Sequence, residues 1–233
     1  MSQKPIISST YRAISILFLT FIFSIPSFSQ GRSYIKQMIR EWGECRNVAI
    51  TKTNGDLALY STNGTAQSGL PDGLSKALTE LNNDRQYIDD VQLTENGRWM
   101  ILYGNNGIRW NDIPYSLEQK LRDYNKRNEV INSVTFNDAG DWIVITDEFY
   151  SSSSSEITQW LKEGESAHGE LWAACITDDA MVAVYAKGYK FYGNVPDSLR
   201  TALKNTSLDV YRLKIAGTAW FFADKNGGYN YNM

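Results

Sequence analysis

Histidine is nearly absent from this chain, whose 233 residues include a single one, His168. Catalysis by a Ser-His-Asp or Cys-His group would have to use His168, and no G-x-S-x-G turn accompanies it. The sequence has no histidine pair and no C-x-x-C motif, which excludes the usual zinc sites. We therefore expect no metal and no cofactor, and we interpret His168 as a solvated residue of a loop.

Cysteine is also scarce, with Cys45 and Cys175 as the only two. Two cysteines cannot form the dense disulfide framework that stabilises small exported domains. In the repeat described below, they occupy different strand positions in units that are not neighbours. We expect both to be small buried apolar residues, and a disulfide between them is the open alternative.

The chain has no excess of positive charge. It carries 23 Lys+Arg against 26 Asp+Glu, a formal net charge of −3. A protein that binds nucleic acid needs a basic patch or stripe to neutralise phosphates. We therefore exclude nucleic acid as the natural partner.

The N-terminal segment has the parts of an export signal. Lys4 and Arg12 provide a basic start, residues 13–23 form an apolar run, and small residues precede a cleavage site ahead of Gln30. The apolar run is shorter than the roughly 20 residues that a membrane-spanning helix requires. We expect residues 1–29 to be a cleaved signal peptide. Residues 30–233 then form one exported domain, periplasmic or extracellular, with no stable membrane span.

What the chain does contain is a repeat. Ile88 lies 43 residues after Cys45 and 43 residues before Ile131, and all three open a similar phrase. We divide the chain into five units at about 45–87, 88–130, 131–170, 171–209 and 210–233. Each unit begins with a strand in which apolar and polar or small residues alternate, the period of a sheet. The apolar pairs are Val48/Ile50, Val91/Leu93, Val134/Phe136, Ala174/Ile176 and Leu213/Ile215.

A turn, a second strand, another turn and a third strand follow in each unit. The first turn contains Asn54-Gly55 or Asn96-Gly97, which supply the positive φ of a tight hairpin. The second strand opens with a large residue, and we expect the tryptophans among these, Trp99, Trp142 and Trp220, to fill the core. In the third unit Ser151–Ser155 replaces the second turn, and we expect a flexible loop there.

Helices are predicted between the units. Pro71, Pro114 and Pro196 mark their first turns, where a missing N–H costs nothing. A further helix is predicted at 33–43, before the first unit, while the fifth unit ends without one. The helix before the first unit can take the place of the helix that the fifth unit lacks. This favours a mainly β protein with helices, in which five βββα units form a closed, five-bladed, propeller-like ring. An open, curved stack of repeats is the alternative.

The phrase VxxVxFxxxGxWxIxYGxNGxxWxxIPxSLxxKLxxxN, best matched by residues 88–130, resembles the tandem repeats of bacterial secreted propeller-like proteins, which are mostly uncharacterised. The resemblance extends over nearly all of residues 30–233, although the third unit departs from it. It implies a scaffold, and because it carries no catalytic motif it does not determine a function.

Carboxylate pairs are the remaining basis for an enzyme, because a glycoside hydrolase needs only two acids about 5–9.5 Å apart. The candidates are Asp89-Asp90, Asp147-Glu148 and Asp178-Asp179. Adjacent strand residues point to opposite faces, so Asp89 and Asp90 cannot simply face each other. The third pair occupies a turn position. We expect that the protein is not an enzyme.

Binding is the better-supported function. The turn before the third strand and the ends of the third strands combine aromatic rings with amides and a carboxylate, groups that suit sugars. The candidate binding residues are Asn105, Asn106, Trp110, Asn111, Asp112, Tyr192 and Asn194. The alternative is that the aromatic residues pack beneath the following helix and the amides serve the turns. We predict a non-enzymatic scaffold that binds a protein partner through the ring ends. A glycan-binding module is the second hypothesis and a carboxylate-pair glycoside hydrolase the third.

Overall fold

The computed structural model describes residues 27–53 and 55–233. The described chain is mostly β with five helices, which confirms the predicted class. The helices are α1 (Ser27–Trp42), α2 (Asp72–Asn83), α3 (Tyr115–Lys126), α4 (Ser155–His168) and α5 (Asp197–Asn205). The predicted signal peptide, apart from residues 27–29, and Asn54 of the predicted first turn lie outside the described residues.

Fifteen strands of the described chain form five three-stranded antiparallel sheets. Each sheet contains three consecutive strands, and we call a sheet together with the helix that follows it a unit. The first strands are β1 (Asn47–Ile50), β4 (Ile88–Leu93), β7 (Ile131–Phe136), β10 (Leu171–Ile176) and β13 (Arg212–Ala216). The second strands are β2 (Asp56–Tyr60), β5 (Trp99–Tyr103), β8 (Trp142–Thr146), β11 (Ala180–Tyr185) and β14 (Ala219–Ala223). The third strands are β3 (Gly64–Ser68), β6 (Gly107–Asn111), β9 (Tyr150–Ser152), β12 (Gly188–Gly193) and β15 (Tyr229–Asn232).

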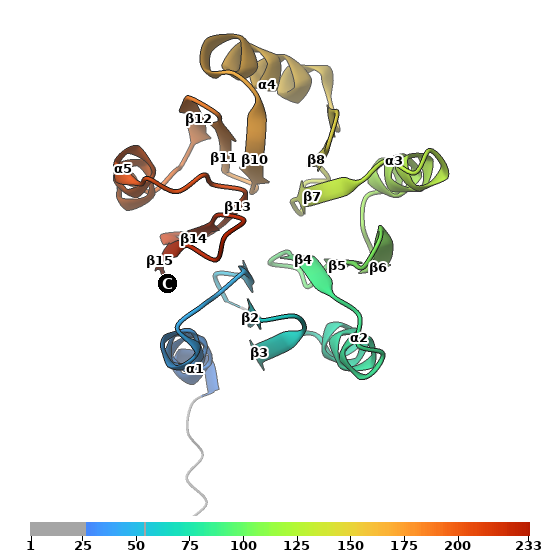
Figure 1. The fold of residues 1–233 in the computed structure, drawn as a ribbon, viewed down its shortest axis with the longest axis vertical. Helices are drawn as coiled ribbons and strands as arrows, with labels where there is room; N and C mark the ends of the chain where they lie inside the picture. The colour runs from blue at the N-terminus through green and yellow to red at the C-terminus, as the bar shows by residue number, and fades with distance from the viewer. Residues whose placement is uncertain (1–26, 54) are drawn as a thin grey trace, which may run out of the picture.

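Figure 1 shows the sheets around a common centre, with the first strands innermost and the helices at the periphery. Each first strand contacts the first strand of the next unit, and β13 of the fifth unit contacts β1 of the first. A neighbouring unit therefore covers each face of a sheet. This explains why β1 and β8 are buried at every position, although one-sided sheets alternate between buried and exposed residues.

The hydrophobic core consists of five clusters, each between two neighbouring units. Helices α2 to α5 each complete the cluster between their own unit and the next. The cluster between the fifth and first units is completed by α1, whose Ile35 and Ile39 pack with Val48 of β1 and Phe221 of β14. At this junction of the two ends of the chain, α1 thus takes the place that α2 to α5 take elsewhere.

Tryptophans of the second strands join a unit to the helix before it. The indole Nε1 of Trp142 donates a hydrogen bond to Ser116 Oγ of α3 at 3.0 Å, and that of Trp220 donates to Ser198 Oγ of α5 at 3.0 Å. Both indole rings are buried, as is that of Trp99, in agreement with the predicted core role. The serine in the I-P-x-S-L phrase therefore has a partner in the next unit.

The prolines lie one residue earlier than predicted. Pro71, Pro114 and Pro196 are the N-cap residues of α2, α3 and α5, with ψ between 133° and 138°. Their carbonyl groups accept the first helical hydrogen bonds, as Pro71 O does from the backbone N–H of Leu74. The fixed φ of proline suits this extended position as well as the first turn, and its missing N–H is needed in neither place.

The serine-rich segment of the third unit forms secondary structure, and the predicted loop is wrong. Strand β9 pairs with β8, and Ser154 caps α4 by accepting a hydrogen bond from the Ile157 N–H at 3.2 Å. Serine is among the strongest helix caps, so here it replaces the proline. Helix α4 extends to His168, which is half-buried at the end of a helix, so its predicted loop position is also wrong.

Helix α1 is longer than predicted, because it begins at Ser27 and not at Ser33, and it ends at Trp42. The predicted cleavage site ahead of Gln30 therefore falls within its first turn. No helix of the described residues is long and apolar enough to cross a membrane.

Cys45 and Cys175 are both buried, and neither forms a disulfide. This confirms their interpretation as small packing residues. Burial raises the pKa of Cys45 to about 12, although nearby hydrogen bonds and Arg46 oppose the change. The thiol form therefore persists at neutral pH.

We predict that Ile39→Ala lowers the free energy of unfolding by about 2–5 kcal/mol, because Ile39 is fully buried between the first and fifth units. Urea denaturation followed by tryptophan fluorescence measures the change. The control is Glu41→Ala on the exposed side of the same helix, which should change it by less than about 0.5 kcal/mol. Parent-like stability of Ile39→Ala would show that α1 is not part of the core.

Candidate binding surface

The two ends of the sheets are built from different segments. We call the end at which the first strands begin the entry end, and the end at which each first strand turns into the second the turn end. The third strands finish at the turn end, so helices α2 to α5 begin there and return the chain to the entry end.

A buried ion pair at the centre joins two units that are not neighbours. Lys214 Nζ of β13 lies 2.7 Å from Asp90 Oδ1 of β4, and both side chains are buried. The same Nζ donates to Gln92 Oε1 at 3.1 Å, and Asn47 Nδ2 of β1 donates to Asp90 Oδ1 at 2.7 Å. The first, second and fifth units are thereby connected through one carboxylate.

The central hydrogen bonds continue into the remaining units. Gln92 Nε2 donates to the carbonyl oxygen of Phe136 in β7 at 3.2 Å. Thr135 Oγ1 of β7 accepts from the backbone N–H of Ile176 in β10 at 3.1 Å. All five first strands are therefore linked by polar side chains at the centre.

The charge state of Asp90 depends on its partners. Burial alone would raise the pKa of this carboxyl, but the charges of Lys214 and Arg212 and the hydrogen bonds from Lys214 and Asn47 outweigh burial. The pKa of Asp90 consequently lies below its ordinary value of 3.8. Asp90 and Lys214 form a charged pair, with each side chain compensating the other.

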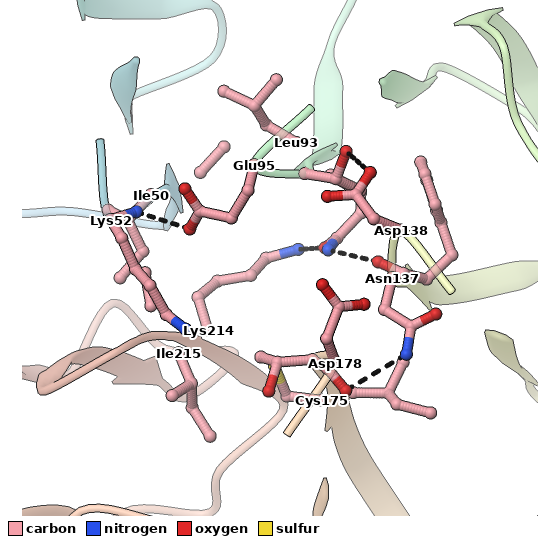
Figure 2. A pocket seen from close by; sticks show the side chains of 17 residues that line it. Ile50, Lys52, Leu93, Glu95, Asn137, Asp138, Cys175, Asp178, Lys214 and Ile215 are labelled. Carbon is pink, nitrogen blue, oxygen red and sulfur yellow. Dashed lines mark hydrogen bonds between the residues drawn. The ribbon is translucent and has the colours of Figure 1, made fainter. Parts of the chain in front are cut away.

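At the turn end, carboxylates connect units in sequence. One acid at the same position of the second, third and fourth units accepts a hydrogen bond from a backbone N–H in the first turn of the preceding unit, around the pocket that Figure 2 shows. The bonds are Lys52 N to Glu95 Oε1 (2.5 Å), Asn96 N to Asp138 Oδ2 (3.1 Å) and Ala139 N to Asp178 Oδ1 (3.1 Å). These acids are thus explained by the fold without a ligand.

The fifth unit has Gly217 at the position of these acids, and Lys52 crosses it. A Cβ on Gly217 would lie 3.4 Å from Lys52 Cγ, and Lys52 Nζ lies 3.7 Å from Asp179 Oδ2 of the fourth unit. The pocket of Figure 2, about 50 Å³ in volume and lined in part by Cys175 and Lys214, has room for a few water molecules only. The turn end is therefore nearly closed.

The entry end carries a repeated β-bulge. In the second, third and fourth units the register of the first strand skips one residue, which leaves it without a partner in the second strand. These residues are Asp89, Asn132 and Trp172, and Arg46 and Tyr211 occupy the equivalent positions of the first and fifth units. All five side chains are half-buried. Since a bulge redirects a side chain, the same backbone feature places Asp89, Asn132 and Trp172 at one end of the centre, beside Arg46 and Tyr211 of the other two units.

A hollow of about 480 Å³ opens at the entry end between the first, second and fifth units, and we call it the entry hollow. Arg46, Asp89 and Tyr211 of the bulge positions line it, together with Tyr87 and Lys225. The aromatic rings hold the cations: Arg46 lies 4.4 Å from the centre of the Tyr87 ring, and Lys225 Nζ lies 4.1 Å from that of Tyr211. Such contacts position a charge without neutralising it.

The structure does not bring the predicted binding residues together. Asn105 and Asn106 lie in the turn between β5 and β6 at the entry end, whereas Trp110, Asn111 and Asp112 lie at the opposite end of β6. Tyr192 and Asn194 are at the end of β12, which Figure 1 shows well separated from β6. The seven residues therefore occupy three places.

Two of the predicted residues have structural roles. The side-chain amide of Asn106 donates to Glu129 O and accepts from the Ile131 N–H at 2.9 Å, which fixes the chain as it enters β7. Asp112 forms an ion pair with Arg98 at 3.1 Å. The amide of Asn106 thus holds the segment before β7 and not its own turn.

The predicted aromatic residues differ from each other. Trp110 is half-buried, packs against the cluster that includes Leu117 of α3, and lines a hollow of about 250 Å³. The guanidinium of Arg122 lies 5.3 Å from the centre of its ring. Tyr192 is 61% exposed, so it does not pack beneath the following helix.

The acids considered for catalysis serve separate purposes. Asp90 pairs with Lys214 at the centre, while Asp89 lies in the entry hollow. Asp147 Oδ1 accepts from the Asn132 side chain at 2.8 Å, and Asp179 Oδ1 accepts from a threonine hydroxyl at 2.9 Å. The described residues include no group of three or more His, Cys, Asp or Glu that could hold a metal ion.

The entry hollow was not predicted from the sequence. Its residues come from the starts of three first strands and from the turns after β2 and β14, which are far apart in the chain. One signal was present: at the position after the first apolar residue of each unit, the five copies differ completely, from arginine to aspartate, asparagine, tryptophan and tyrosine. A position that varies within an otherwise regular repeat is typical of the surface, so this pattern could have placed the five side chains outside the core.

No family model matches the chain, and no curated protein sequence is similar to it. Among solved structures, it is similar to the crystal structure of the C-terminal domain of gp131 from bacteriophage phiKZ, with 12% identity over 66% of this chain and a TM-score of 0.37. The match spans 53% of that chain. A likeness at this level carries no argument, and the resemblance to secreted propeller-like repeat proteins stays a prediction.

We predict that Asp90→Asn lowers the free energy of unfolding by about 3–5 kcal/mol, because it leaves the Lys214 ammonium buried without a counter-charge. The double variant Asp90→Asn with Lys214→Met removes both charges and should recover a large part of this loss. Urea denaturation of the parent, the single variants Asp90→Asn and Lys214→Met, and the double variant gives the coupling energy. Additive effects of the two substitutions would contradict a direct pair.

We also expect the ion pair to produce a pH dependence. Since the pKa of Asp90 in the folded chain lies below 3.8, its stabilising effect is complete above that pH and is lost as the pH falls through the folded-state value. The free energy of unfolding of the parent should therefore fall more steeply below about pH 4 than that of Asp90→Asn. Parallel curves of stability against pH for the two proteins would contradict this expectation.

Proposed function

We propose that the five units close into a five-bladed, propeller-like ring, and that this ring is an exported, non-enzymatic scaffold that binds a partner protein through its entry end. The contact between β13 and β1 and the packing of α1 between the fifth and first units support the closed ring over the open stack. The N-terminal export pattern supports a periplasmic or extracellular location.

The observation that carries this proposal is that three exposed apolar side chains lie at the entry end. Tyr87 and Val130 directly precede the first strands of the second and third units, and Phe149 lies in the turn after β8. They are 41%, 51% and 51% exposed. Aromatic and apolar side chains beside arginine are typical of the centre of a protein–protein interface. The turn end also exposes Tyr115 and Tyr192, but its polar groups are used for bonds between units.

The glycan-binding hypothesis has less support. The Trp110 ring, one of its two predicted stacking platforms, is half-buried and lies beneath Arg122, and Tyr192 is exposed on a separate unit. The amide of Asn106 is already bonded within the fold. The hydrolase hypothesis has even less support, because Asp90 and Asp179 are engaged in separate interactions.

We predict that a photo-cross-linking amino acid at Val130 or at Phe149 forms the same protein adduct in an envelope extract of the source cells. Both positions lie at the entry end, so one partner should contact both. The adduct should disappear when Tyr87→Ala is added. The control position is Tyr115, which is 75% exposed at the turn end and should form no such adduct. Equal labelling from Tyr115 would contradict the proposal that the partner binds at the entry end.

A further inference from the structure

The entry hollow is lined by charged side chains of both signs in equal number. The carboxylates are Glu44, Asp89 and Asp224, and the cations are Arg46, Arg212 and Lys225. Among the residues that the structure describes, none of these six forms an ion pair. The charges of the hollow therefore balance, but they are held apart from one another.

Four of the six charges are held in place by neighbouring groups. The guanidinium of Arg46 and the ammonium of Lys225 each lie over a tyrosine ring, 4.4 and 4.1 Å from its centre. Arg46 also donates to two backbone carbonyl oxygens, at 3.0 and 3.2 Å. Glu44 Oε1 accepts from one backbone N–H at 3.0 Å, and Asp224 Oδ1 accepts from two, at 2.7 and 2.8 Å. These contacts fix the positions of the four side chains and leave their charges in place.

Asp89 and Arg212, by contrast, have hydrogen-bonding groups that the fold does not use. Among the described residues, none donates a hydrogen bond to the Asp89 carboxylate, although this side chain is half-buried. Burial raises the pKa of Asp89, and Arg212 is the charge that most opposes this change. Of the five N–H donors of Arg212, one bonds to a backbone oxygen, at 3.1 Å. An acceptor and a set of donors thus face the same hollow without contacting each other.

We infer that the entry hollow binds a free α-amino acid. Its carboxylate accepts hydrogen bonds from Arg212, and its ammonium donates to Asp89. The volume of about 480 Å³ lies within the range of about 300–1,000 Å³ that small-molecule sites have, so room remains for a side chain. The inference goes beyond the proposed function, because the occupant is a small molecule and not the partner protein.

The balance of charges favours a zwitterion over a ligand of one sign. An anion would meet Arg212 but would lie beside the unpaired Asp89 carboxylate, and a cation would lie beside Arg212 in the same way. An α-amino acid carries both charges close together, so it forms charge-assisted hydrogen bonds with Asp89 and Arg212 at once. Its net charge of zero matches that of the lining.

The aromatic contacts do not favour a sugar. A sugar ring would stack on a free aromatic face, but the Tyr211 ring is stacked on Trp172 at 5.3 Å and also contacts Lys225. The Tyr87 ring is in contact with Arg46. These rings position charged groups, and recognition depends on the charges themselves.

The test begins with thermal unfolding of the purified protein in the presence of each common amino acid in turn. A ligand that binds only the folded chain raises the midpoint of unfolding. The amino acid with the largest effect is then titrated by calorimetry, beside its N-acetyl derivative, which lacks the ammonium, and its amide, which lacks the carboxylate. We expect saturable binding of the free amino acid. Each derivative should bind about tenfold or more weakly, because one charged group of the site loses its partner.

Variants of the two recognition residues assign each end of the ligand. Asp89→Asn and Arg212→Gln should each weaken binding of the free amino acid by about tenfold or more. Asp89→Asn should have little effect on the affinity for the N-acetyl derivative, which has already lost that contact. Arg212→Gln should likewise have little effect on the affinity for the amide. A general disturbance of the fold would weaken every ligand equally and would not produce this pattern.

The matched controls are Asp72→Asn and Arg40→Gln, which make the same changes of charge at exposed positions of α2 and α1. They should leave the affinity within about twofold of the parent. The inference is wrong if no amino acid binds, if either derivative binds as tightly as the free amino acid, or if the control variants weaken binding as much as Asp89→Asn and Arg212→Gln.

This inference and the proposed function fail separately. If the cross-linked adduct forms through Val130 and Phe149 but no amino acid binds, only the present inference is wrong. If an amino acid binds through Asp89 and Arg212 but no adduct forms, the entry hollow is a small-molecule site and the partner-binding function is wrong.

Discussion

The buried pair of Lys214 and Asp90 is the constraint on which the rest of this structure depends. A charge removed from water must meet its opposite in good geometry, and here the opposite charge belongs to a unit that is not adjacent. The two strands that carry the pair can be brought together only with the strands between and beside them, through Asn47 and Gln92. Such a pair contributes little net stability compared with apolar packing, but removing one partner would leave the other charge buried without compensation, so β4 and β13 must keep the register that brings the two together.

Around this centre, an apolar cluster holds each unit to the next, and two kinds of hydrogen bond reinforce some of the junctions. A helix completes the apolar layer, a tryptophan indole bonds to a helix serine, and a turn carboxylate accepts from the preceding backbone. No unit has a complete core alone, since every cluster draws residues from two units. The outer layers are therefore cooperative in the manner of repeat proteins, whose units are stabilised by their neighbours.

The repeated elements could be predicted because they depend on local patterns. Alternation, Asn-Gly turns and prolines each specify the backbone within a few residues, and the strands and helices follow them. The prediction of a loop in the third unit failed because serine can cap a helix as effectively as it can occupy a loop. Only the packing of α4 decides between a helix cap and a loop. The central pair could not be predicted, since Lys214 and Asp90 are 124 residues apart. The entry hollow was missed for the same reason, because bulges and turns from distant segments form it.

The position of α1 between the first and fifth units has a consequence for the order of folding. Its Lys36 Nζ bonds to the backbone oxygen of Met233, the last residue, at 2.5 Å, and its apolar face packs on strands from both ends of the chain. During synthesis this helix is made first, and its second packing surface is made last. The layer between those units cannot form until β14 and β15 have been synthesised, so a nascent chain keeps one apolar surface uncovered until then. Contacts of such sequence separation slow folding, because the loop between them must close before the contacts form.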